Sequence, residues 1–351
     1  MRRFPSPPHA LKPAASRRGV ALIASSALVG LLLAGCGSAA SSGSSSTPSS
    51  GASSPGGSGS PSSPGTAEPA VAGAFGAQPT ITIPKSDPPA KTVVDVLTKG
   101  TGPALKSGDL AVVDDYGRTW ASATAFADTY DSTTVPDTLP VGTGQLAMTG
   151  LDKALVGVPT GSRVLVVIPP SEGFGIVSGL PSGIKNTDTA VMVFDVLAGY
   201  GGDAGPSGDV VGGGGGALPT VTSADLRSKP TITIPKTAAP SKLSVTTLVQ
   251  GDGPAVAKGQ ELVVQYVGEI WASGKEFDSS WQRKTPTAFP VGVGQLIPAW
   301  DTGLVGVKVG SRVMIVAPPA DGYGPSGQPD AGISGTDTLV FVVDVLGAYD
   351  S

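Results

Sequence analysis

The sequence predicts an α+β fold that is built twice along the chain, each time as an antiparallel β-sheet wrapped around one short α-helix. Short motifs recur about 150 residues apart, a period too long for a solenoid, which indicates a duplicated domain. Within each copy, β-rich runs are separated by glycine and proline, and one short stretch favours a helix. The recurring pairs are 79–85 with 230–236, 100–103 with 251–254, 141–146 with 291–296 and 161–164 with 310–313.

The β-strands are expected where Val, Ile and Leu cluster between turn residues. The helix is expected from Pro298 to Leu304, since a proline in the first helical turn forfeits no hydrogen bond. A sheet that carries one helix is typical of α+β domains. The expected strands are 262–267, 312–317 and 338–346 in the second copy, and 110–113, 163–168 and 189–197 in the first.

Composition divides the chain into five parts. Residues 37–78 are mostly Ser, Gly, Pro and Ala, which bury too little apolar surface to offset the entropy of ordering. Five glycines at 212–216 indicate a linker, because no strand-to-helix frame marks them as a phosphate-binding loop. The expected parts are an export signal at 1–35, a disordered tether at 36–78, a first domain at 79–200, a Gly-rich linker at 201–228 and a second domain at 229–351.

The first 35 residues have the pattern of an export signal. A basic start precedes an apolar run at 19–34 that is short for a membrane span. Small residues then precede Cys36, the single cysteine, as in the lipobox of bacterial lipoproteins, which this stretch resembles. The resemblance implies cleavage before Cys36 and a lipid on its thiol; an unprocessed anchor helix with an incidental cysteine is the alternative. Arg17 and Arg18 leave both the general secretory and the twin-arginine export routes open.

Charge and residue usage exclude several kinds of site. The chain holds 23 basic and 27 acidic residues, and without the expected signal, whose five charged residues are all basic, 18 and 27 remain, a net charge of −9. A basic nucleic-acid surface is therefore not expected. His9, the single histidine, lies in the signal, so the mature chain is expected to lack His-dependent nucleophilic and His-ligated metal sites. We expect no cofactor, no metal and no disulfide.

Aromatic residues gather in the second copy in a characteristic order. Although aromatics make up 5% of the chain, one stretch of about 75 residues holds all five that matter here, Tyr266, Phe277, Trp300, Tyr323 and Phe341. The order and spacing resemble the FKBP-type peptidyl-prolyl cis-trans isomerases, and the alternative is an ordinary aromatic core. The residues that carry the resemblance are Tyr266, 277–280 (Phe-Asp-Ser-Ser), 295–300 (Gln-Leu-Ile-Pro-Ala-Trp), 322–324 (Gly-Tyr-Gly) and 338–341 (Thr-Leu-Val-Phe).

The resemblance implies a role for each matching residue. It places Trp300 as the floor of a pocket, with aromatic walls around it, and a free backbone N–H at Ile297 that donates to a substrate carbonyl. Tyr323 would donate its hydroxyl to the carbonyl before proline, and Asp278, with Arg283 as its basic partner, would orient the tyrosines. Gln295 stands where the family usually has glutamate. The implied walls are Tyr266, Phe277 and Phe341, and the implied further substrate contacts are Leu296, Arg283, Gln295 and Ile333.

The first copy has lost most of this set. Aligning the two copies on 120–122 and 271–273 places Phe126 opposite Phe277, the one residue of the set that is unchanged. A charge replaces an apolar wall, and leucine replaces the indole, so we expect this copy to be catalytically weak or inactive. The replacements are Asp115 for Tyr266, Ala127 for Asp278, Leu151 for Trp300, Phe174 for Tyr323 and Met192 for Phe341.

The function that the resemblance implies is peptidyl-prolyl isomerisation by the second copy, aiding the folding of exported proteins. X-Pro segments of unfolded chains are the implied substrates and macrolides such as rapamycin possible ligands. The chain is expected to be lipid-anchored on the outer face of the bacterial cytoplasmic membrane. Two alternatives stay open: a proline-peptide-binding or chaperone-like lipoprotein without significant turnover, and an envelope spacer. A hydrolase is disfavoured, because the folded segments hold no Gly-x-Ser-x-Gly elbow.

Overall fold

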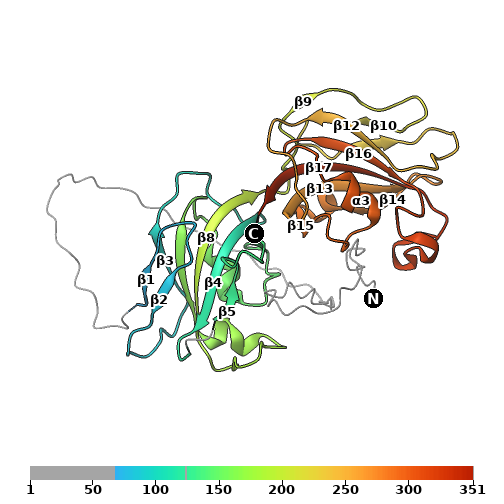
Figure 1. Ribbon diagram of the computed structural model, residues 1–351. Coiled ribbons are helices and arrows are strands. Elements are labelled where there is room, and N and C mark those ends of the chain that lie inside the picture. The colour runs from blue at the N-terminus through green and yellow to red at the C-terminus, as the bar shows by residue number, and fades with distance from the viewer. Residues whose placement is uncertain (1–67, 123–124, 351) are drawn as a thin grey trace, which may run out of the picture.

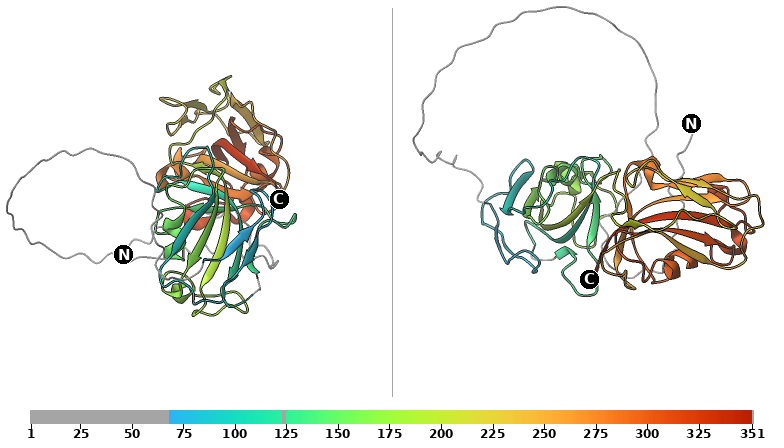
Figure 2. Two further views of the ribbon diagram at one scale, coloured as in Figure 1. Left: turned by 90° about the vertical axis from the view of Figure 1, so that its left-hand side faces the viewer. Right: turned by 90° about the horizontal axis from the view of Figure 1, so that it is seen from above.

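The structure is a computed structural model that describes residues 68–122 and 125–350. It shows two β-rich bodies beside each other, one formed by each copy (Figures 1 and 2). The expected export signal, the lipobox with Cys36 and most of the expected tether lie outside the described residues. Among the helices that are described, none is long and apolar enough to cross a membrane.

The first copy is one antiparallel sheet with a short helix against its inner face. The strand order is β3-β7-β8-β4-β5, and β6 pairs with the far end of β4. Helix α1 (Thr149–Ala154) contacts β7. The strands are β3 (Val93–Thr98), β4 (Leu110–Thr119), β5 (Ala125–Asp128), β6 (Asp137–Pro140), β7 (Arg163–Ile168) and β8 (Ala190–Tyr200), followed in the β7–β8 loop by the 3-10 turns η1 (Pro170–Glu172) and η2 (Phe174–Ile176).

The second copy repeats this arrangement, which confirms the predicted α+β fold. Its order is β14-β13-β17-β16-β12-β9, with β15 also pairing with β13, and α3 (Pro298–Gly303) lies on the inner face with proline in its first turn. A one-turn helix not foreseen from the sequence, α2 (Ser280–Arg283), follows β14. The strands are β9 (Asp209–Val210), β12 (Ser244–Gln250), β13 (Glu261–Ile270), β14 (Lys275–Ser279), β15 (Thr287–Pro290), β16 (Arg312–Ala317) and β17 (Leu339–Tyr349); the turns are η3 (Gly324–Ser326) and η4 (Pro329–Ala331).

A two-stranded hairpin covers the outer face of each sheet. The hairpins are β1 (Ala70–Ala72) with β2 (Thr80–Thr82), and β10 (Thr220–Thr222) with β11 (Thr231–Thr233). The alternation of strand side chains puts Ile81 and Ile232 against apolar residues of their sheets. The repeated motif at 79–85 and 230–236 therefore covers apolar strand residues that would otherwise face solvent.

A buried ion pair fastens each hairpin region to its sheet. Arg163 and Asp195, on neighbouring strands, are 1% and 0% exposed, and Arg312 and Asp344 are 3% and 1% exposed. Each guanidinium binds its carboxylate through two nitrogens and also donates to the segment that precedes its domain: Arg163 to two carbonyls, and Arg312 to one carbonyl and the Ser223 hydroxyl. Because a buried charge without its partner is strongly destabilising, each pair ties the outer segment to the sheet.

The two copies contact each other through equivalent surfaces. Tyr200 and Tyr349 are the last residues of β8 and β17, and their hydroxyl oxygens lie 2.5 Å apart. Val112 and Val263 share one buried cluster between the copies. In a two-fold dimer, each subunit likewise uses the same surface to contact the other; here the two surfaces belong to one chain.

The segment 201–228, expected to be a linker, contains paired strands. β9 extends the sheet of the second copy beyond β12, and β10 forms half of the outer hairpin. Figure 1 shows both beside that copy. The linker is thus bound to the second copy along much of its length.

Protonation of Glu261 is predicted to stabilise the protein. This carboxyl is 7% exposed at the start of β13, and burial, followed by repulsion from Asp137 of the first copy, raises its pKa to about 8. The stabilisation is fully present below the unfolded pKa, near 4.5, and is lost as the pH rises through about 8.

We therefore expect Glu261→Gln, measured by calorimetry on the full chain, to flatten the fall of Tm between pH 5 and pH 9 by roughly several degrees. Glu68→Gln, at an exposed position, serves as the control. An unchanged pH slope in Glu261→Gln would contradict the assignment.

Candidate functional site

The indole of Trp300 lies at the centre of an aromatic cluster in the second copy. It is 2% exposed and stands on α3, facing the inner surface of the sheet. Three rings surround it, with centroids 5.1 Å away at Tyr266, 5.2 Å at Phe289 and 5.3 Å at Phe341. Phe277 continues the set, 5.6 Å from Phe341. We call these five residues the aromatic site.

Sheet register brings the walls together. Gly268 on β13 lies opposite Phe341 on β17 and Asp278 on β14. A Cβ at Gly268 would lie 2.6 Å from the ring of Phe277 and 3.1 Å from that of Phe341, so the two rings approach only because this position has no side chain. Edge-to-face contacts such as theirs are favourable and rigid.

A polar triad forms the rim. The Tyr266 hydroxyl donates to Asp278 Oδ2, and Arg283 Nη2 donates to the same hydroxyl at 3.0 Å. Arg283 Nη1 binds the other oxygen of Asp278 at 2.5 Å, and the guanidinium carbon lies 5.5 Å from the centre of the tyrosine ring. The ring, the carboxylate and the guanidinium thus fix one another.

Besides the buried indole N–H of Trp300, two hydrogen-bond donors at this site have no acceptor in the described part of the chain: the Ile297 backbone N–H and the Tyr323 hydroxyl. Ile297 precedes the first turn of α3, where backbone N–H groups lack helical partners. Burial, aided by the negative charge of Asp278, raises the pKa of Tyr323 to about 12, so its hydroxyl keeps its proton at neutral pH. Both can donate to a carbonyl of a bound peptide.

The remaining predicted residues lie in the same region. Leu296 and Ile333 are each 2% exposed and belong to the core cluster that contains Trp300. Ile333 exchanges two backbone hydrogen bonds with Gln328 and holds the loop after η3 in place. Gln295 is half-buried, two residues before Ile297.

Sequence reasoning missed Gln265 and assigned no contact to Ser280, which it named as part of the motif at 277–280; both are polar residues behind Tyr266. Ser280 Oγ accepts the Tyr266 backbone N–H at 2.8 Å and itself donates to Gln265 Oε1. Both side chains are 0% exposed. Gln265 adjoins Tyr266 in sequence, but its role depends on a partner from another part of the chain, which no local pattern announces.

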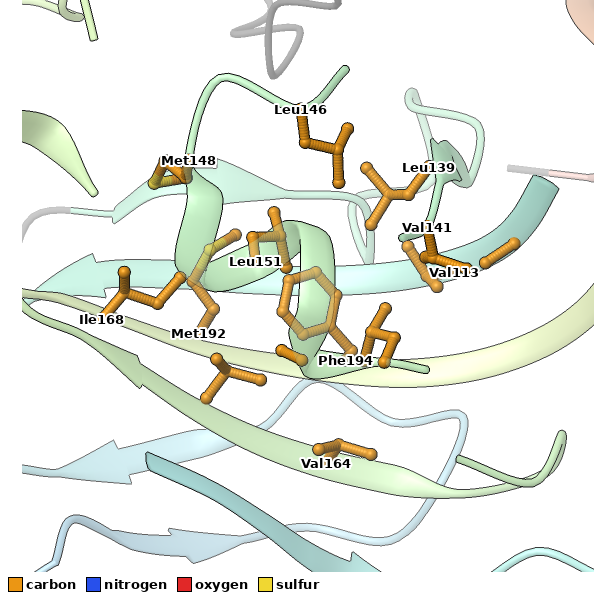
Figure 3. Packing of buried hydrophobic residues seen from close by; sticks show 14 of the residues in the cluster. Val113, Leu139, Val141, Leu146, Met148, Leu151, Val164, Ile168, Met192 and Phe194 are labelled. Atoms are coloured by element: carbon orange, nitrogen blue, oxygen red, sulfur yellow. The ribbon is translucent and has the colours of Figure 1, made fainter. Parts of the chain in front are cut away.

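The first copy has a different interior at the equivalent place. Register confirms the alignment of the copies on the sheet, since Asp115 lies opposite Phe194 as Tyr266 lies opposite Val343, and Gly117 lies opposite Met192 as Gly268 lies opposite Phe341. Figure 3 shows Leu151 on the helix directed toward Met192 and Phe194 of the sheet, in the place where the second copy has its indole.

The first copy's equivalents of Phe277 and Tyr323 are buried rather than partly exposed. Phe126 and Phe174 are 5% and 3% exposed and meet edge to face at 5.1 Å, whereas their equivalents Phe277 and Tyr323 are half-buried. The first copy also lacks the triad, because Ala127 replaces the aspartate. Its interior is filled by its own side chains.

Asp115 is an unusual residue in this interior. It is 0% exposed, and neither carboxylate oxygen has a hydrogen-bond partner in the described part of the chain. Burial is the main cause that holds its pKa well above the ordinary value, and the nearby carboxylates of Asp137, Asp114 and Asp128 add to it. The described residues hold no group of three or more His, Cys, Asp or Glu that could bind a metal ion.

Comparison with known proteins gives the same result for both copies. The profile of the FKBP-type peptidyl-prolyl cis-trans isomerases matches residues 102–197 and 253–346. An FK506-binding protein of Streptomyces anulatus is 40% identical over 118 residues, which are 34% of this chain and 95% of that protein. A probable FK506-binding protein of Corynebacterium glutamicum is 40% identical over 122 residues, 34% of this chain and 98% of that protein.

Among solved structures, the crystal structure of AtFKBP13 is 34% identical and covers 31% of this chain and 94% of its own, with a TM-score of 0.29. Both outer hairpins, at 70–82 and 220–233, lie outside the two ranges that the family profile matches.

Asp115→Val is expected to stabilise the protein. The substitution removes a buried carboxyl that has no partner and restores an apolar side chain among apolar neighbours, for a gain of about 1–3 kcal/mol at pH 7. Calorimetry of the full chain would show a higher Tm, and the gain should shrink in acid, where the carboxyl is protonated in both states. A lower Tm at pH 7 would show that Asp115 has a stabilising partner.

Proposed function

The chain belongs to the family of FKBP-type peptidyl-prolyl cis-trans isomerases, and on this premise we propose that its second copy carries out the catalysis while the first is inactive. The observation that supports this most is the contrast at one position. The second copy places an indole against three aromatic rings, with a fourth ring packed on one of them and two free donors in the same site. The first copy places Leu151 there and a buried carboxyl on the neighbouring strand.

The chemistry needs no nucleophile and no metal. Rotation about an X–Pro bond must overcome amide resonance, a barrier of about 18–20 kcal/mol. The twisted amide is less polar than the planar one, so apolar surroundings such as the aromatic site favour the twisted state over the ground state. Trp300 would lie beneath the proline ring, and Ile297 N–H and Tyr323 Oη would hold carbonyls on either side of the rotating bond.

The proposed substrates are proline-containing segments of unfolded chains, since X–Pro isomerisation limits many folding reactions. FK506-type macrolides are proposed ligands of the same aromatic site. A second candidate function is capture of proline segments without turnover. It is favoured by the first copy, which keeps the fold without the aromatic set.

We also propose that the protein is exported and held at the outer face of the bacterial cytoplasmic membrane by a lipid on Cys36. The support is the sequence of residues 1–36: a basic start, an apolar run and small residues before the single cysteine. A polar tether follows, long enough to keep the domains away from the membrane surface.

An exchange assay on a proline peptide with the full chain tests the catalytic proposal. We expect turnover that FK506 blocks, a loss of at least about tenfold in kcat/KM for Trp300→Leu, which copies the first domain into the second, and little change for Leu151→Met. Turnover retained in Trp300→Leu would refute the assignment to the second copy. FK506 binding without any turnover in the unmodified chain would favour the capture function.

Lipidation is tested by mass spectrometry of the protein from membranes of an actinobacterial host. The expected mature chain begins at Cys36 and carries acyl mass, and Cys36→Ser should release the protein from the membrane fraction. An uncleaved, unacylated N-terminus in the unmodified protein would contradict the proposal.

A further inference from the structure

We propose that the segment leaving the first copy, Gly201–Gly202, is a positioning element of the aromatic site in the second copy, so that the inactive copy contributes to the activity of its neighbour. The inference rests on the proposed function, because it concerns the site assigned there to the second copy. It starts from the observation that Gly202 lies against residues immediately behind Tyr266 and Arg283.

The start of this segment is clamped between the copies. Tyr200 precedes it at the end of β8, and its hydroxyl shares a 2.5 Å hydrogen bond with that of Tyr349. Gly347 makes the approach possible, since a Cβ there would lie 2.1 Å from the Tyr200 hydroxyl oxygen. Two residues after this clamp, the chain reaches the back of the site.

A chain of hydrogen bonds then runs from the linker to the wall of the site. The Gly202 carbonyl accepts from Gln265 Nε2 at 2.9 Å, Gln265 Oε1 accepts from Ser280 Oγ, and Ser280 Oγ accepts the Tyr266 backbone N–H at 2.8 Å. A carbonyl can only accept and a backbone N–H can only donate, so both ends fix the direction of every bond between them. The backbone of Tyr266 is therefore tied to a residue of the linker.

The same glycine also supports the turn that carries Arg283. A Cβ at Gly202 would lie 2.2 Å from the carbonyl oxygen of Lys284, so the two backbones touch. Lys284 ends α2 in the left-handed conformation, at φ 55°, the single non-glycine residue with positive φ in the described part of the chain. Arg283 precedes it and binds both Asp278 and the Tyr266 hydroxyl.

In the first copy, the hydrogen bonds behind Asp115, the equivalent of Tyr266, include none to a linker carbonyl in the described residues. There the Asp115 backbone N–H donates to Thr129 Oγ1 at 2.7 Å, as Tyr266 does to Ser280. Thr129 Oγ1 reaches Asp114 Oδ1 at 3.5 Å, which is long for a hydrogen bond, and Asp114 is half-buried with no linker carbonyl on it in the described residues. The continuous series of hydrogen bonds from the linker to this strand is present in the second copy, which also has the aromatic site.

The inference predicts that displacing Gly202 lowers activity without unfolding the protein. In Gly202→Ala the new methyl group collides with Lys284, and the turn bearing Arg283 must shift. We expect kcat/KM to fall by about three- to tenfold, since orientation of the groups around a reacting bond contributes directly to rate. Gly212→Ala is the matched control: it lies in the same linker, and a Cβ there meets nothing within 4 Å.

A second variant acts through the hydrogen bonds alone. Gln265→Met keeps the length of the side chain but removes both the donor to Gly202 and the acceptor from Ser280. It should lower kcat/KM in the same direction as Gly202→Ala, and Gly202→Ala combined with Gln265→Met should cost less than the two single losses multiplied together, because both break one connection.

A spectroscopic measurement separates positioning from loss of stability. In ¹⁵N-labelled full chain, the backbone amide of Tyr266 and the side-chain Nε–H of Arg283 should shift in Gly202→Ala and in Gln265→Met, and remain in place in Gly212→Ala. Tm is measured on each variant, so that an unfolded variant is recognised and the other decides.

The outcomes distinguish the two proposals. No FK506-sensitive turnover in the unmodified chain refutes the proposed function. Turnover in the unmodified chain that both folded variants retain in full, with Tyr266 and Arg283 signals unmoved, overturns the positioning role and leaves the proposed function intact. Lower turnover in both variants with these signals shifted, and with Gly212→Ala unaffected, supports it.

Discussion

The buried pair of Arg312 and Asp344 is the interaction on which the arrangement of the second copy depends. Burial raises the pKa of Asp344 to about 6 although Arg312 opposes this, so the carboxylate is charged at neutral pH and needs its partner. Charge in a sheet interior is costly, and the pair adds little by itself, but it binds Ser223 and Leu226 of the outer segment at the same time. The sheet and the segment before the domain are thereby joined.

The same device in the first copy has a different consequence. Arg163 and Asp195 hold the loop between β1 and β2, around Gly73 and Ala77, on the N-terminal side of the first copy. In the second copy the corresponding segment is the connection from its neighbour. The same kind of ion pair holds an outer segment on each sheet. In the second copy that segment is part of the chain that connects the two domains.

The two copies share one fold but differ in the residues that line the interior. The second copy keeps an aromatic interior whose outer members, Phe277 and Tyr323, are half-buried, and Tyr323 and Ile297 offer donors there. The first copy fills the equivalent interior with Phe126 and Phe174 and retains its outer surfaces. The first copy packs against the second through equivalent faces of the two domains.

The sequence by itself determined the fold class and the duplication, because strand patterning, helix-start chemistry and motif repeats are local properties. Trp300, Tyr266 and Phe341 could be grouped in advance because their order and spacing resemble those of the FKBP family. The tertiary structure decided what depends on pairing between distant segments: the strands inside the expected linker, the contact of Tyr200 with Tyr349, and the bond of Gln265 to Gly202. A glutamine beside a tyrosine carries no sign of its partner 63 residues away. Only the folded chain brings that partner within hydrogen-bond distance.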